Sequence, residues 1–484
     1  MGKYEFVPTN SKRYKDGFLI TNDYGNWCFL SEKEYMEYKK DDMSDDLIKK
    51  LLDNFMLIEN GNFESHGKRF DEFFWYLKES TNLHIVVPTL RCDLTCKYCY
   101  AFREPVESHD KDMTPEMMDK TIDFIMDTPE EKITIEFTGG EPLLRFDLIL
   151  RAFERSQKLS QEKNKDVKYA LITNATHLND EVYDFLIRNK DKISVCLSLD
   201  GPKEVHDYNR KLTSATSSSY EITTRAIKKF KELGYPSMTA MPVITRKSLD
   251  NWKEIVDEYV RMGFGVLRFK YVSRFGYASK VWQRDGYTAE EFLEKWKSVV
   301  NYMLELNKKG VQITEQLTIL ILIKFLKGFN PNYAEMMNPC GAVITQLLYD
   351  YDGSIYPCDE SRTNEEFKIG DVNTSKYNDL LEHPVTKTMT SISNLSTYNC
   401  DNACPWSSFC GICPLEIYIE KKGFVSNINS NYRHKIHLGM FEFIMDKILH
   451  NPEEKELLMK WPEVVPGIPE LYETDVHRRN IFKK

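Results

Sequence analysis

The sequence predicts an α/β protein built around a parallel sheet or partial barrel. From residue 83 onward, short apolar runs rich in β-branched residues alternate with longer segments of helical period, and this alternation occurs six times. Repeats of this kind place the chemistry at the C-terminal ends of the strands. The expected strands are 83–90, 132–138, 168–174, 193–200, 237–245 and 266–272. The expected helices are about 114–127, 147–163, 179–188, 219–233, 249–262 and 289–308.

The regions before and after these repeats have a different pattern, so we expect three domains in the 484 residues. The first is a small α+β domain, with strands at Phe18 to Thr21 and Trp27 to Leu30 and helices from Glu32 to about Met56. The last is rich in turns and cysteines and ends with a helix at about 435–450. The expected domains are 1–80, 81–310 and 311–484.

Composition excludes several classes of partner. The chain has 65 basic and 74 acidic residues, a net charge of −9, and no basic block, so we expect no nucleic-acid partner. The strongest apolar run, Leu317 to Ile323, is much shorter than the roughly 20 residues of a membrane-spanning helix, so we expect no membrane partner. The first residues lack the apolar stretch of a secretory signal, which favours a cytoplasmic location.

The eleven cysteines indicate metal binding. Thiols are kept reduced in the cytoplasm, so a disulfide framework is not expected there. Nine of the cysteines fall in three groups, as metal ligands do. Cys28 and Cys196 stand apart in apolar stretches, and we interpret both as buried structural thiols.

The first group lies directly after the first expected strand and reads Cys92-x₃-Cys96-x₂-Cys99. Three thiolates on one loop can hold three irons of a [4Fe–4S] cluster and leave the fourth iron open to a substrate or cofactor. The alternative is a structural zinc site. Zinc sites of that kind need four closed ligands, and no fourth Cys or His lies nearby in the sequence.

A second motif follows the next strand, Thr138-Gly139-Gly140-Glu141-Pro142. Two glycines allow a ligand to approach the backbone, and a carboxylate can accept hydrogen bonds from an ammonium group. The motif stands one βα repeat after the cysteine loop, again at a strand end.

Together the two motifs resemble those of the radical S-adenosylmethionine (SAM) superfamily over residues 83–310. The resemblance implies a partial (β/α)₆ barrel with Cys92, Cys96 and Cys99 as cluster ligands and Gly139, Gly140 and Glu141 at the SAM amine. It also implies that Tyr98 lies near adenine and that Arg210 meets the SAM carboxylate. The positions that usually face SAM correspond to Asn174, Ser198 and Asp200. The alternative for Asn174, Ser198, Asp200 and Arg210 is strand-end capping and surface pairing. Ala175 departs from the family, which often has Gly at that position.

The remaining cysteines resemble the SPASM domain, the auxiliary-cluster module of radical SAM enzymes that modify peptides and proteins. Cys340 and Cys358 match its opening, with Gly353 four residues before the second cysteine, and Cys400-x₃-Cys404-x₅-Cys410-x₂-Cys413 resembles its second half. The resemblance implies one cluster on Cys340, Cys358 and Cys413 and another on Cys400, Cys404 and Cys410, each one cysteine short. A single auxiliary cluster and a zinc ribbon are the alternatives.

Two further residues are predicted to act near these clusters. We expect His434 to complete the cluster of Cys400, Cys404 and Cys410, since imidazole can replace thiolate on cluster iron. The alternative is an exposed histidine near a helix start. We expect Asp359 to be a catalytic proton acceptor close to the substrate, whereas its alternative role is a hydrogen bond that orders the cysteine loop.

Short segments across nearly the whole chain resemble the radical SAM maturases of the His-Xaa-Ser peptide system. They are 18–25, 83–92 and 409–414. This resemblance implies a peptide-modifying oxidoreductase that abstracts hydrogen from a ribosomally made precursor peptide, with an electron donor such as flavodoxin or ferredoxin. Residues 1–80 would bind the leader peptide by strand addition, or would only cover the barrel.

Two alternative functions remain. The segment Tyr356-Pro357-Cys358-Asp359 resembles anaerobic sulfatase maturases, which oxidise Ser or Cys in a protein. The other alternative is an iron–sulfur sensor or scaffold that never cleaves SAM, and the intact Gly-Gly-Glu-Pro motif argues against it.

Overall fold

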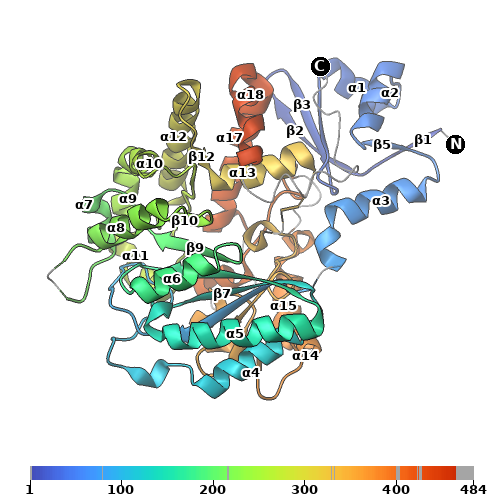
Figure 1. Ribbon diagram of the computed structural model, residues 1–484. Helices are drawn as coiled ribbons and strands as arrows, with labels where there is room; N and C mark the ends of the chain where they lie inside the picture. Colours follow the sequence, from blue (N-terminus) through green and yellow to red (C-terminus); the bar gives the residue numbers. More distant parts are fainter. Residues whose placement is uncertain are drawn as a thin grey trace. The chain divides into compact units, whose positions relative to one another are not determined.

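A computed structural model describes residues 3–464, apart from residues 79, 215–216, 329, 332, 399–403, 422 and 424–427. The chain forms two compact units (Figure 1). The sheet unit comprises 79–317 and 342–389, and the three-segment unit comprises 1–78, 318–341 and 390–484. The division into three consecutive domains stays a prediction, and the structure adds that residues 342–389 pack with the sheet.

The sheet unit contains an eight-stranded sheet in the order β10-β9-β8-β7-β6-β13-β14-β15. Neighbouring strands from β10 to β13 are parallel, and β14 and β15 continue the sheet antiparallel. The first five expected strands are present, the fifth shorter than expected, whereas β13, β14 and β15 were not expected. The bounds are β6 Leu83–Thr89, β7 Lys132–Gly139, β8 Asp166–Thr173, β9 Ile193–Ser198, β10 Met238–Met241, β13 Gln346–Tyr349, β14 Ser354–Tyr356 and β15 Gly370–Asp371.

The sixth expected strand, 266–272, differs from the expectation. Only β11, Val266–Leu267, is a strand, and it pairs in parallel with β12, Thr314–Glu315, outside the eight-stranded sheet. The backbone N–H of Phe269 donates to Oε1 of Glu315 at 3.2 Å. Because this donor is turned toward a side chain, no continuous strand follows Leu267, and the expected pairing with the fifth strand is present as an isolated parallel bridge between Ile244 and Tyr271.

All six expected helical segments of the sheet unit are present, the fifth as two helices, α9 and α10. Their starts follow the usual capping chemistry: Thr114 caps α4 through its side chain, with proline at the first helical position. Four helices, α7, α11, α14 and α15, were not expected. The bounds are α4 Pro115–Met126, α5 Phe146–Lys163, α6 Asp180–Arg188, α7 Lys203–Asn209, α8 Ser219–Glu232, α9 Arg246–Asp250, α10 Trp252–Arg261, α11 Gly276–Asp285, α12 Ala289–Lys308, α14 Tyr377–Glu382 and α15 Pro384–Ser393.

The two faces of the parallel sheet differ in their surroundings. On β7, Ile133, Ile135 and Phe137 are buried, and Phe137 lines an apolar layer shared with side chains of α5 and α6. Successive side chains of a strand point to opposite faces. Glu136 on β7 and Cys196 on β9 therefore face away from this layer, and both are only partly buried. We call this side of β7 to β10 the open face.

The three-segment unit begins with the small sheet that the sequence predicts. Strands β3 and β4 form the expected hairpin, and β2 adds a third strand whose polar sequence, Thr9–Tyr14, gave no strand signal. The bounds are β1 Tyr4–Phe6, β2 Thr9–Tyr14, β3 Gly17–Asn22, β4 Trp27–Leu30, α1 Glu32–Lys40, α2 Asp45–Asp53, β5 Leu57–Glu59 and α3 Phe63–Phe73.

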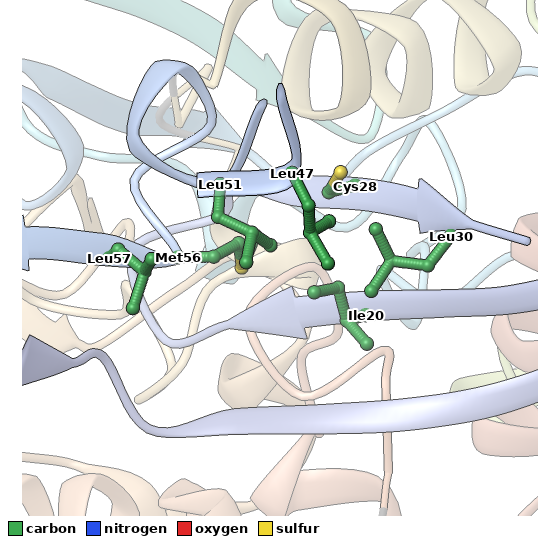
Figure 2. Close-up of a cluster of buried hydrophobic side chains, with 7 residues drawn as sticks. All are labelled: Ile20, Cys28, Leu30, Leu47, Leu51, Met56 and Leu57. Atoms are coloured by element: carbon green, nitrogen blue, oxygen red, sulfur yellow. The ribbon is translucent and has the colours of Figure 1, made fainter. Parts of the chain in front are cut away.

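Cys28 lies in the core of this small domain, as expected. Its thiol is 3% exposed, and Figure 2 shows its side chain among apolar side chains from β3, β4, α2 and β5. Cys196 differs from the expectation, because it is partly exposed on the open face. The residues of the cluster in Figure 2 are Ile20, Cys28, Leu30, Leu47, Leu51, Met56 and Leu57.

The rest of the three-segment unit is mainly helical. The expected final helix is present as α17, which begins slightly earlier than expected. Among the helices that the structure describes, none is both long and apolar enough to cross a membrane. The bounds are α13 Gln316–Leu322, α16 Pro414–Lys421, α17 Tyr432–His450 and α18 Pro452–Lys460.

Arg69 on α3 connects the first two segments of the three-segment unit. Its side chain is 2% exposed, and its guanidinium donates to Oδ1 of Asn26 at 2.8 Å and to the carbonyl of Tyr24 at 2.6 Å. It also donates to the carbonyl of Gly328 at 3.0 Å. A buried guanidinium thus satisfies acceptors from segments far apart in the sequence.

We expect Arg69→Met to destabilise the three-segment unit by about 3 kcal/mol, because the buried acceptors lose their donor. Lys68→Met, at an exposed position of the same helix, is the control. Urea-induced unfolding followed by circular dichroism measures the difference. A midpoint for Arg69→Met equal to that of Lys68→Met would contradict the role assigned to this side chain.

Candidate functional site

The loop that carries Cys92, Cys96 and Cys99 follows β6 directly. Cys92 is 7% exposed, and its sulfur accepts from the backbone N–H of Leu94 at 3.4 Å and from Nδ2 of Asn174 at 3.6 Å. The backbone N–H of Cys99 donates to the carbonyl of Cys96 at 3.2 Å. The loop thus carries its three thiols beyond the end of β6 and directs two donors at the sulfur of Cys92.

Burial affects the protonation of these thiols. Burial raises the pKa of Cys92 well above its usual value and raises the pKa of Cys96 to about 12, although Arg210 opposes the second shift. Thiols of this kind remain protonated near neutral pH unless a metal displaces the proton. The donor set, three thiols on one loop with amide donors to sulfur, fits iron of a [4Fe–4S] cluster.

Gly139 and Gly140 allow β7 to pack against the backbone that leads into the cysteine loop. Gly139 has φ +121°, and a Cβ there would lie 2.7 Å from the carbonyl oxygen of Thr89. A Cβ on Gly140 would lie 2.1 Å from the carbonyl oxygen of Arg91. The sequence suggested that these glycines admit a ligand, and the structure shows that they admit the neighbouring chain. Their contact with SAM stays a prediction.

Glu141 joins the ends of β7 and β8. Its side chain is fully buried, Oε1 accepts from Oγ1 of Thr173 at 2.8 Å and from the N–H of Leu143 at 3.1 Å, and Oε2 accepts from the N–H of Asn174 at 2.9 Å. Burial raises the pKa of Glu141, and these donors act in the opposite direction. Most of the accepting capacity of the carboxylate is thus used within the protein. Its contact with the SAM amine stays a prediction.

Asn174 and Ala175 shape the end of β8 beside the cysteine loop. Nδ2 of Asn174 also donates to Oδ1 of Asp93 at 3.2 Å, which fixes the amide next to Cys92. Ala175 is 3% exposed and has φ +71°, a left-handed conformation that favours glycine. The frequent glycine of related enzymes at this position therefore has a conformational reason.

Tyr98, Asp200 and Arg210 form one hydrogen-bonded group. The hydroxyl of Tyr98 donates to Oδ2 of Asp200 at 2.7 Å, and Nε of Arg210 donates to Oδ1 of Asp200 at 3.0 Å. The guanidinium carbon of Arg210 lies 5.3 Å from the centre of the Tyr98 ring. Asp200 is completely buried, and its backbone N–H lies 3.2 Å from Nδ1 of His206. Ser198 ends β9 beside Met241 of β10.

The structure therefore brings together most of the residues predicted to surround SAM, at the carboxyl ends of β6 to β9. The contacts of Asp200 and Arg210 include both pairing and capping. They fit the predicted role toward SAM and also the structural alternative. Their roles toward SAM stay predictions.

The auxiliary cysteines are divided between the two units. Cys340 belongs to the three-segment unit, where its N–H donates to Oγ of Ser393 at 2.8 Å. Cys358 belongs to the sheet unit, where its N–H donates to Oγ of Ser361 at 3.1 Å. Cys400 lies outside the described residues.

Cys404, Cys410 and His434 line one pocket of the three-segment unit. His434 stands in the first turn of α17, where its N–H donates to Oδ1 of Asn431 at 2.9 Å. Its Nδ1 is buried and has no hydrogen-bond partner in the described part of the chain, and burial lowers the pKa of the imidazole. The alternative of an exposed histidine is wrong, because the side chain lies in this pocket. The other residues of the pocket are Leu395, Trp406, Ser407, Ile428, Leu438 and Phe441.

In the part of the chain that the structure describes, no group of three or more His, Cys, Asp or Glu side chains is placed to hold a single metal ion. A [4Fe–4S] cluster makes a different demand, because each thiolate binds a different iron. The thiol groups at the end of β6 and in the pocket of His434 are therefore candidates for cluster ligation rather than for a zinc site.

Sequence reasoning missed Glu136 on the open face. Burial and the neighbouring Asp359 raise the pKa of Glu136 to about 7, whereas Arg268 lowers it. Burial, Asp359 and Glu136 also raise the pKa of Tyr100, which follows the cysteine loop. The sequence signal was an acidic residue in the middle of an apolar strand, Ile133-Thr134-Ile135-Glu136-Phe137, where a charge has no structural reason.

Residues 86–259 match the profile of the Radical SAM superfamily. The chain contains a radical SAM domain. The α/β fold class and the cofactors, a [4Fe–4S] cluster and SAM, are therefore confirmed.

Relatives and solved structures extend this comparison. A cysteine-type anaerobic sulfatase-maturating enzyme of Clostridium novyi is 24% identical over 341 residues, which cover 69% of this chain and 87% of that protein. The structure of native anSMEcpe with bound AdoMet has a TM-score of 0.65 at 19% identity and covers 77% of this chain and 100% of its own. The structure of Streptococcus suis SuiB bound to its precursor peptide SuiA has a TM-score of 0.53 at 15% identity and covers 86% of this chain and 96% of its own.

We expect Ala175→Gly to stabilise the radical SAM domain by about 0.5 to 1 kcal/mol. Glycine adopts a positive φ without steric strain, and this gain exceeds the cost of the greater entropy of the unfolded chain. Ala226→Gly in the middle of α8 is the control and should destabilise by about 1 kcal/mol. Thermal unfolding of both variants measures the two effects. A lower transition temperature for Ala175→Gly than for the wild type would contradict this account of the β8 end.

Proposed function

We propose that the protein is a radical SAM maturase that installs a modification in a ribosomally synthesised precursor peptide. The observation that carries the proposal is the convergence of Cys92, Cys96 and Cys99 with the Tyr98–Asp200–Arg210 group at one end of the parallel sheet. When bound there, the cluster and SAM supply a 5′-deoxyadenosyl radical that abstracts hydrogen from a C–H bond.

The protein's own residues position these reactants. The guanidinium of Arg210 is held by the buried Asp200 and can bind a carboxylate. The ring of Tyr98 lies beside this guanidinium. Glu141 and the two glycines before it fix the β7 end against the cysteine loop. Asp359, close enough to Glu136 to affect its pKa, is proposed as the acceptor of the proton that is released when the substrate radical is oxidised.

A peptide substrate is supported by the fold match to peptide-bound SuiB and by the small sheet of residues 1–78. In the order β2-β3-β4, the outer edges of β2 and β4 pair with no other described strand. Either edge can accept an extended leader peptide through backbone hydrogen bonds. Deleting residues 1–80 would also break the compact unit that they share with 318–341 and 390–484, so point substitutions test leader binding better.

A second candidate is the oxidation of Ser or Cys in a sulfatase-type protein. The Clostridium novyi relative and the segment Tyr356-Pro357-Cys358-Asp359 favour it. Both candidates require the same radical step and an electron donor, for which a flavodoxin or ferredoxin is proposed. They differ in the substrate alone.

Co-expression with each short peptide that the neighbouring genes encode should give one peptide of altered mass, detected by mass spectrometry. Replacing Cys92, Cys96 and Cys99 together by Ala should abolish both this product and 5′-deoxyadenosine, because no iron ligand remains on the loop. Cys28→Ala, a buried thiol of the other unit, is the control and should keep the product. An unmodified peptide with wild-type protein, together with an oxidised sulfatase, would favour the second candidate.

The auxiliary clusters are proposed to use Cys340, Cys358 and Cys413 in one case and Cys400, Cys404 and Cys410 in the other. His434 is proposed as a ligand of the second cluster. The pocket that it shares with Cys404 and Cys410, and its unpartnered buried nitrogen, support this ligation.

We expect His434→Ala to lose iron from one auxiliary cluster, and His434→Cys to keep the iron at a lower reduction potential, because thiolate adds negative charge. His450→Ala, at the other end of α17, is the control. Iron and sulfide analysis with Mössbauer spectra and redox titration measures these effects. Full iron and an unchanged auxiliary potential in His434→Ala would exclude histidine ligation.

A further inference from the structure

Lys324 is a buried cation of the three-segment unit. It directly follows the apolar run Leu317 to Ile323 and stands in a helical turn, Ile323–Lys327, where it is 1% exposed. Its ammonium group donates to the carbonyl of Phe409 at 2.9 Å and to the carbonyl of Met336. Both acceptors are neutral, so they satisfy the hydrogen-bonding capacity of the group without balancing its charge.

The other buried cations differ from Lys324 in having a carboxylate partner. Six lysines and arginines are buried among the described residues, and five of them form an ion pair. No carboxylate of the described residues lies within ion-pair distance of Lys324. A buried charge without a counter-ion is unfavourable, and burial lowers the pKa of Lys324 to about 7. The five pairs are Arg69–Glu72 at 3.0 Å, Arg91–Asp112 at 2.7 Å, Arg210–Asp200 at 3.0 Å, Arg433–Glu416 at 3.5 Å and Lys447–Glu454 at 2.6 Å.

The hydrogen bonds of Lys324 place its charge beside a proposed cluster ligand. The carbonyl of Phe409 belongs to the peptide bond that enters Cys410, so the ammonium group lies next to the backbone of this cysteine. Cys410 is 7% exposed and lines the pocket that also contains Cys404 and His434. A thiolate is an anion, and a cluster bound by thiolates is an anion as well. The counter-ion that the described carboxylates do not provide can therefore come from this pocket.

We propose that Lys324 is the counter-ion of an anionic iron–sulfur cluster held by Cys410, and that its charge raises the reduction potential of this cluster. Reduction adds one electron to a group that is already negative. A cation fixed beside the cluster, away from water, therefore stabilises the reduced form more than the oxidised form. Lys324 acts through its charge and binds no iron. This inference rests on the auxiliary cluster of the proposed function and is independent of which substrate is modified.

Two substitutions separate the charge of Lys324 from its hydrogen bonds. Lys324→Gln removes the charge and keeps an N–H donor, whereas Lys324→Arg keeps the charge. Lys447→Gln is the control, because it removes the other buried lysine of the described residues, about 20 Å along α17 from His434. The parent for all three variants is the full-length chain with the three cysteines of the radical SAM loop replaced by Ala, so that only auxiliary clusters form with added iron and sulfide.

Redox titration followed by electron paramagnetic resonance measures the ratio of reduced to oxidised cluster. In Lys324→Gln we expect this ratio, at a fixed applied potential, to fall at least about tenfold for one auxiliary cluster. This fall corresponds to a potential lower by about 59 mV for a one-electron couple. Lys324→Arg and Lys447→Gln should titrate as the parent chain does, and iron and sulfide analysis should give equal cluster contents.

The outcomes separate this inference from the proposed auxiliary cluster. A parent chain that binds no iron overturns the cluster and this inference with it. Bound iron with an unchanged potential in Lys324→Gln, or an equal shift in Lys447→Gln, overturns the inference alone. Loss of iron in Lys324→Gln that does not occur in Lys324→Arg supports a requirement for the charge. Loss of iron in both variants shows that the packing of the lysine side chain is what matters and overturns the inference.

Discussion

The buried carboxylate of Glu141 is the interaction on which the geometry of the radical SAM site depends. Its oxygens accept from Thr173, Asn174 and Leu143, so the ends of two strands and the turn after β7 meet at one group. Its own backbone N–H donates to the carbonyl of Arg91 at 2.7 Å, in the chain that enters the cysteine loop. Together with the contacts of Asn174 to Cys92 and Asp93, this residue therefore fixes the loop that carries the thiols to the strand ends.

Much of the fold could be predicted because its elements are long and periodic. The helices of the sheet unit and the first five parallel strands show clear apolar periods. The elements that were missed lack such an apolar period. Strand β2 is polar, and β13 is a four-residue strand that becomes part of the sheet only through its pairing with β6. A tertiary contact, from Phe269 to Glu315, decides the end of β11, and no local pattern shows it.

The residues of the candidate site also fall into those that the sequence shows and those that it does not. The cysteine spacings and the Gly-Gly-Glu-Pro motif are local, so the sequence shows them directly. The sequence also showed that Ala175 stands where the family often has glycine, and its positive φ explains why glycine is favoured there. Glu136 belongs to no motif, since its environment is formed by Asp359 and Arg268, more than a hundred residues away in the chain. Sequence alone shows the ligands, whereas the environment of an isolated acid requires the fold.

The composition of the three-segment unit has a consequence for biosynthesis. The ribosome makes residues 1–78 first, yet the acceptor of Arg69 at Gly328 and the partner of Lys12 at Glu442 emerge hundreds of residues later. These contacts therefore form late, although the apolar core around Cys28 lies within residues 20–57 and is made early. The pocket that Cys404, Cys410 and His434 line is likewise complete only when residues up to Phe441 have been made.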